Sequence, residues 1–139
     1  MIFEEIKDIS GAKIVLLKVE SGEDLLASMQ SFVEKMNIKN AVIVSGIGSA
    51  VSYSFHVVSS SELPPKETYP RDDIPVDISN IQGYVIDGKV HAHITFSTSQ
   101  VSFGGHLEPG VKVLTFAIVT LIVLPGELNI SSWDKIVKT

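Results

Sequence analysis

Apolar residues follow two different periods along the chain, which separates one helix from several strands. The run AKIVLLKVE at residues 12–20 is rich in Val, Leu and Ile and predicts a strand. Residues 23–37 then place apolar side chains at helical spacing and predict an amphipathic helix. Ser21, three residues before Asp24, resembles the start of a capping box. The apolar positions of this helix are Leu25, Leu26, Met29, Phe32, Val33 and Met36.

After this helix the apolar runs are short and predict strands. They cover residues 41–45, 51–59, 84–86, 89–96 and 113–124, with a weak return to structure at 78–81. Asp87-Gly88 predicts a type I′ hairpin between the runs at 84–86 and 89–96.

Gly46 and Gly48 suggest a dinucleotide-binding loop, but the third glycine is missing and a strand follows instead of a helix. We therefore expect these glycines to permit a tight connection between two strands.

Two polar segments are predicted as loops, and together with the strands they indicate the fold class. Residues 60–76 hold four prolines and form a long loop, which could act as a lid, contact a partner or be partly disordered. Residues 97–112 form a second loop, rich in glycine. One early helix followed by strands predicts a single α+β domain over residues 1–139, with its core at about 10–125 and a mixed, mostly antiparallel sheet.

Composition excludes several function classes. With no cysteine, disulfides, zinc–thiolate sites and thiol nucleophiles are ruled out. The net charge of −5 and the scattered Lys and Arg disfavour direct DNA binding. The acidic start lacks the pattern of a secretory signal, and the apolar run at 113–124 is well short of the roughly 20 residues of a bilayer span. We expect a cytoplasmic protein without a membrane segment.

Three of the four histidines fall close together in the sequence, as His91 and His93 in VHAHITF and His106 in FGGHLEPG. Side chains in a strand alternate between faces, so His91 and His93 share a face. A third imidazole arriving from the glycine-rich loop completes a three-histidine set, the ligand number of many catalytic zinc sites. The alternative is an ordinary half-buried strand that turns its histidines toward water.

The order of motifs resembles the plants and prokaryotes conserved (PPC) domain, also labelled DUF296. The match spans roughly residues 10–125. The residues that carry it are Gly22-Glu23-Asp24, Ser45 to Ser49, Gly83, His91, His93, Gly104-Gly105-His106-Leu107 and Gly110.

The resemblance implies a compact α/β domain with a mixed, mostly antiparallel sheet that assembles as a homotrimer. The residues matching His91, His93 and His106 resemble a metal site, with zinc as the implied ion. Plant members follow AT-hook motifs, and prokaryotic members stand alone and are often labelled predicted DNA-binding proteins. This chain has no AT-hook, carries Lys18 where an Arg is common, and lacks the acidic residue that many members have in the last strand.

Three functions remain open. The first is a trimeric zinc protein with a small-molecule ligand near the metal; if it is hydrolytic, Glu108 and Asp87 are candidate bases, although surface carboxylates are the simpler explanation for both. The second is a DNA-binding or DNA-associated protein, and the third is a trimeric interaction module without chemistry. The sequence assigns no catalytic residue, and His56 is not included in the site.

Overall fold

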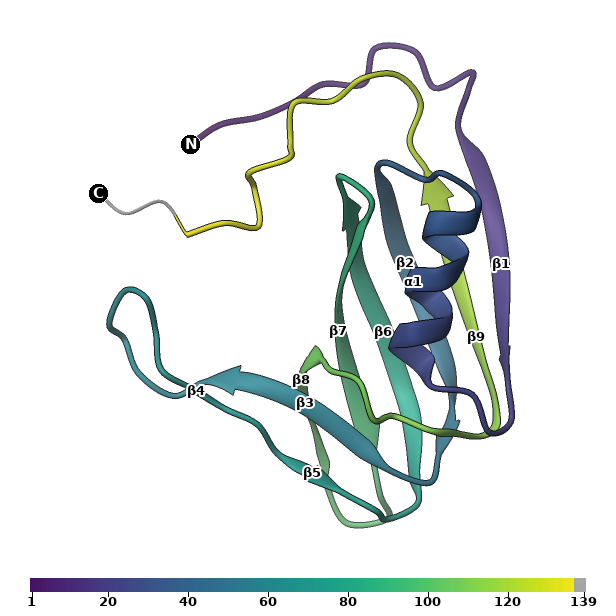
Figure 1. Ribbon diagram of the computed structural model, residues 1–139, viewed down its shortest axis with the longest axis vertical. Coiled ribbons are helices and arrows are strands. Elements are labelled where there is room, and N and C mark those ends of the chain that lie inside the picture. The colour runs from purple at the N-terminus through teal and green to yellow at the C-terminus, as the bar shows by residue number, and fades with distance from the viewer. Residues whose placement is uncertain (137–139) are drawn as a thin grey trace.

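The computed structural model describes residues 1–136 and consists of one large sheet with a helix on one face (Figure 1). The elements in chain order are β1 (Lys13–Glu20), α1 (Leu25–Lys35), β2 (Ala41–Ala50), β3 (Tyr53–Val58), β4 (Glu67–Thr68), β5 (Arg71–Asp72), β6 (Val76–Ile86), β7 (Lys89–Ser97), β8 (Ser102–Leu107) and β9 (Val113–Val123). None of the helices in the described part is long and apolar enough to cross a bilayer.

The strands are hydrogen-bonded in the order β1-β9-β2-β6-β7-β8-β3-β4, and β5 pairs with β3. Every named strand pair within residues 1–136 is antiparallel. The expected antiparallel sheet with one early helix is confirmed, whereas a mixed sheet is not seen in this range. The helix is a minor component of 11 residues.

The helix begins later than expected because Asp24, and not Ser21, is its N-cap. The Oδ1 atom of Asp24 accepts the Ala27 N–H at 2.9 Å, and its Oδ2 atom accepts the Gly110 N–H at 2.7 Å. One carboxylate therefore caps the helix and ties it to the segment between β8 and β9.

The core lies between α1 and the face of the sheet that the helix covers. Leu25, Met29 and Val33 are buried along the helix, at the spacing that places them on one face. They form one cluster with buried residues of the sheet, among them Ile81 and Phe96. Alternate residues of each strand therefore face the opposite side, where the histidines lie.

One expectation about glycines is corrected and another is confirmed. Gly46 and Gly48 do not join two strands but lie inside β2, which runs on to Ala50. A Cβ at Gly48 would collide with the Phe116 carbonyl oxygen on β9, so the glycine permits close approach of neighbouring strands. The hairpin at Asp87-Gly88 is confirmed, with φ of 49° and 78° as a type I′ turn requires.

The two predicted loops both contain strands. The segment 97–112 includes β8, and the segment 60–76 includes the two-residue strands β4 and β5, which pair with β3. The weak return at 78–81 is the middle of β6. Figure 1 shows the N-terminal segment and the chain after β9 running together beyond the end of the sheet.

Candidate metal centre

His91 and His93 project from the face of β7 opposite the helix. The residues that alternate with them, Ala92, Ile94 and Phe96, are each no more than 3% exposed and belong to the core. His91 is partly exposed and His93 is exposed. Strand alternation therefore places both imidazoles on one face, as expected from the sequence.

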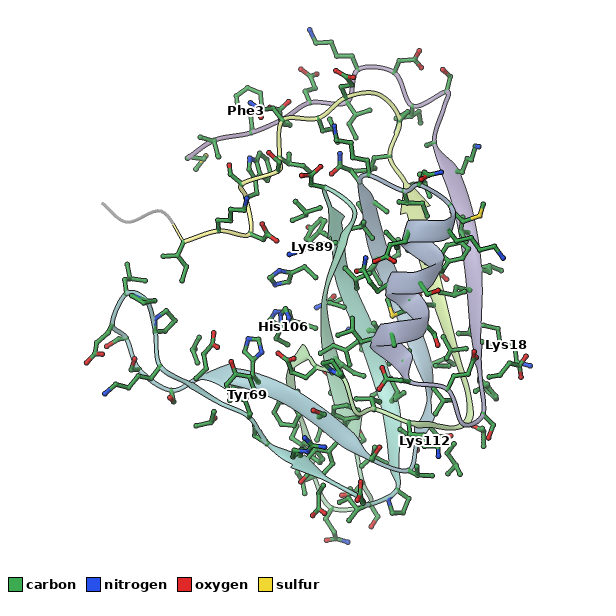
Figure 2. The ribbon with its side chains drawn as sticks, in the orientation of Figure 1. Phe3, Lys18, Tyr69, Lys89, His106 and Lys112 are labelled. Carbon is green, nitrogen blue, oxygen red and sulfur yellow. The ribbon has the colours of Figure 1, made fainter. Side chains whose placement is uncertain are left out.

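His106 reaches the same face from β8, a strand and not a loop. It lies directly opposite His93 in the β7–β8 register. A Cβ at Gly104 would collide with the Ile94 carbonyl oxygen, and one at Gly105 with the His56 carbonyl oxygen. The two glycines thus let β8 fit between β7 and β3. The ring centroid of His106 lies 4.5 Å from that of His91 and 5.6 Å from that of His93. Figure 2 labels His106 beside these strands.

The structure brings the three predicted histidines together. Each can offer a ring nitrogen such that the three nitrogens lie within 4.8 Å of one another. The rings of His91 and His93 are nearly parallel, 6° apart, and His106 stands at 87° and 82° to them. Zinc–nitrogen bonds of tetrahedral geometry separate two ligand nitrogens by about 3.3 Å. Side-chain rotations that bring the three ring nitrogens from within 4.8 Å to this separation would form a three-nitrogen ligand set.

His56 also belongs to the cluster, although no pattern in the sequence indicated it. It pairs with His106 across β3 and β8, and the two rings stack at a centroid distance of 4.3 Å. Its Nδ1 atom lies 2.5 Å from a Glu108 carboxylate oxygen, and its Nε2 atom lies 3.6 Å from Glu67. His56, His106 and Glu108 form a second set of potential metal ligands.

The cluster favours neutral imidazoles at two positions. Burial is the main cause that lowers the pKa of His106 to about 4, and the neighbouring His56 and His91 lower it further. Burial also lowers the pKa of His93, together with His91 and His56. Neutral imidazole is the form that binds a metal, so both residues are ready to act as ligands at neutral pH.

The two candidate carboxylates differ in position. Glu108 is 27% exposed in its side chain and holds His56. Asp87 lies in the β6–β7 turn, where its N–H donates to the Asn40 side chain, and it belongs to neither ligand set. Asp134, which the sequence did not suggest, lies near His91 with Oδ2 3.9 Å from Nδ1.

Several hollows border the histidines, and His91 lines two of them. One has a volume of about 570 Å³ and is lined by His91, His93, Gln82 and Tyr84 with neighbouring residues of β2. The other has a volume of about 390 Å³ and lies between the terminal segments and the sheet, where it shares His91 and Tyr84 with the first. A small molecule could reach the histidine cluster from either hollow.

An antiparallel single-sheet domain with histidines gathered on its open face defines the class of protein. The chain belongs to the Plants and Prokaryotes Conserved (PCC) domain family, which it matches over residues 7–125. The family resemblance stated from the motifs is therefore confirmed. No curated protein matches the chain.

Several solved structures share the fold. A metal-containing protein from Archaeoglobus fulgidus is 24% identical, with a TM-score of 0.72 over 83% of this chain and 81% of that one. A plant- and prokaryote-conserved protein from Pyrococcus horikoshii is 25% identical, with a TM-score of 0.67 over 83% and 80%. A candidate DNA-binding protein from Bacteroides thetaiotaomicron is 20% identical, with a TM-score of 0.66 over 87% and 83%.

Proposed function

We propose that His91, His93 and His106 bind one divalent metal ion, zinc, and that the centre receives a small-molecule ligand. The observation that carries the proposal is the convergence of three imidazole nitrogens on one face of the sheet. The metal-containing neighbour from Archaeoglobus fulgidus supports it at the level of the fold.

Three protein ligands leave a coordination position for a ligand. Zinc bound by the three histidines would act as a Lewis acid toward an oxygen of the ligand in that position. The protein's own contribution lies around it, where Glu108 fixes His56 against the ring of His106. Because Glu108 is a partly buried carboxylate at the edge of the cluster, hydrolysis is the reaction class to assay.

Metal analysis of protein purified without an affinity tag tests this proposal. We expect one zinc per chain, and calorimetric titration of the metal-free protein should show the same stoichiometry. His91→Ala and His106→Ala should abolish binding, whereas His56→Gln should retain it. Loss of zinc in His56→Gln but not in His91→Ala would assign the metal to the second ligand set instead.

We further propose that the chain forms a homotrimer through the sheet face opposite the helix. Large apolar side chains stand exposed on β1, β2 and β9 of this face: Ile14, Leu16, Val44, Ile47, Leu114, Phe116 and Ile118. An apolar surface of this extent is typical of an association site. The family resemblance suggests the number of subunits.

Light scattering at micromolar concentration tests the assembly. The wild type should have three times the mass of one chain, and Leu16→Lys should lower that mass. The matched control is Leu63→Lys, because Leu63 is equally exposed, 73% against 72%, but lies in the segment before β4. A monomeric wild type would contradict the proposal.

DNA binding is the alternative function, favoured by the description of the Bacteroides neighbour. The net charge of −5 opposes it, because non-specific affinity comes from clustered Lys and Arg that release counterions from phosphates. We therefore expect no retained duplex complex in a gel shift at about 150 mM salt, close to physiological ionic strength. A complex with submicromolar affinity would establish the alternative.

A further inference from the structure

The hollow between the terminal segments and the sheet is built partly by residues outside the family match. Glu4 and Ile6 line it from the N-terminal segment, and Ile130, Trp133 and Asp134 line it from the C-terminal one. The family match covers residues 7–125 and leaves these residues out. The terminal segments therefore close the hollow over Tyr84, Ile86 and His91 of the sheet.

The walls and size of the hollow suit an apolar group. Leu124, Ile130 and Trp133 contribute side chains from the C-terminal part of the chain, and Ile86 does so from β6. An apolar cavity of about 150 Å³ holds one benzene. A hollow of about 390 Å³ therefore has room for a ring or a short alkyl chain with a polar end.

The charged residues of the lining indicate which polar group a ligand in this hollow would carry. Among residues 1–136, Glu4 and Asp134 are the acidic residues of the lining, and no Lys or Arg of this range lines it. The Asp134 side chain is only 22% exposed, and within residues 1–136 no hydrogen bond to its carboxylate is found. The nearest titratable side chain is His91, whose Nδ1 atom lies 3.9 Å from Oδ2 of Asp134. A ligand ammonium beside Asp134 would donate a charge-assisted hydrogen bond to its carboxylate, whereas the carboxylate would repel a ligand carboxylate.

We propose that this hollow binds the apolar body of a small alkyl- or arylammonium ligand, with the ammonium group beside Asp134. His91 and Tyr84 line both hollows, so a ligand here lies next to the histidine cluster. The inference rests on the proposed function in one respect only, which is that a metal ion bound by His91 would lie beside the ligand. Binding of the apolar body and the ammonium requires no metal and can be measured on the metal-free protein.

Trp133 is the single tryptophan of the chain and lines the hollow, so its fluorescence reports occupancy. The experiment titrates metal-free and zinc-loaded protein with hexylamine, hexan-1-ol and hexanoate, which share one apolar body and differ in charge. We expect saturable binding, with hexylamine about tenfold tighter than hexanoate because a partly buried carboxylate attracts one and repels the other.

Two variants separate this effect from general electrostatics. Asp134→Asn should remove most of the preference for hexylamine while hexan-1-ol binds as before. Asp73→Asn changes the net charge equally at an exposed position away from the lining and should leave the preference intact. Zinc affinity should be unchanged in Asp73→Asn, because Asp73 belongs to neither ligand set.

Several results would overturn the inference. These are equal affinity for the three probes, no Trp133 response, or an Asp134→Asn variant that loses zinc but keeps its preference for hexylamine. A change of oligomeric mass in Asp134→Asn would show that another subunit occupies the hollow. Failure of the wild type to bind zinc would contradict the proposed function alone, since the metal-free titration still judges the hollow.

Discussion

Replacing His93 by Ala distinguishes two roles of the metal. The metal either binds to a protein that folds without it or is required for folding. His93 is exposed on the outer face of β7, between Gln82 on β6 and His106 on β8. No hydrogen bond to its side chain is found in the described part of the chain. The truncation opens no core cavity, so the metal-free variant should keep the wild-type free energy of unfolding to within about 0.5 kcal/mol.

The effect should appear only when zinc is present. Zinc at a hundredfold excess over its Kd stabilises the folded state by about 2.7 kcal/mol. For a domain of this size each kcal/mol raises Tm by about 3–4 °C, so zinc should raise the wild-type Tm by roughly 10 °C. With two of three ligands left, His93→Ala should lose almost all of this increase.

Thermal melts with and without zinc, at fixed protein concentration and with size exclusion on each sample, measure both quantities. Gln82→Ala is the matched control, because Gln82 lies directly across from His93 on the same face but is not part of either ligand set. An unfolded or monomeric metal-free His93→Ala variant would refute the reasoning. The metal would then be structural, and its binding energy would be folding energy.

Three further outcomes follow from the site and its supports. Gly104→Ala should lower both Tm and zinc affinity, because its Cβ would collide with the Ile94 carbonyl oxygen and push β8 from β7; calorimetry and a melt measure both. Stability of the metal-free protein should fall as pH drops from 6.5 toward 4, where the unfolded chain protonates His106 but the folded chain, with a pKa of about 4, does not. His106→Gln should show a shallower fall in the same pH series of melts, and an equal one would refute the assignment. Asp24→Ala should cost about 1–3 kcal/mol in denaturant unfolding, since the helix loses its cap and the Gly110 N–H its acceptor.

Local pattern was enough for much of the fold. The period of apolar residues placed α1 to within two residues at each end, and Asp87-Gly88 defined the β6–β7 hairpin. Alternation along β7 placed His91 and His93 on one face. Each of these features depends on neighbours in sequence, so it can be read without knowing what packs against the element.

Two strands were predicted wrongly from the sequence because they contain glycines. A glycine in a strand weakens the strand pattern, so β8 appeared to be a loop and β2 appeared to end before Gly46. Whether a glycine marks a turn or a close approach depends on the neighbouring strand. At Gly48 and Gly104 that neighbour is the backbone of β9 or β7, whose position is known only from the sheet.

The sequence by itself determined the family, the helix, the antiparallel hairpin and the pair of imidazoles on β7. Only the tertiary structure decided which distant residues join them. His56 meets His106 because β3 pairs with β8, and Asp134 approaches His91 because the chain after β9 returns past the end of the sheet. The physical reason is that strand order and chain path are set by burial of the whole apolar face. No local spacing along the chain records that constraint.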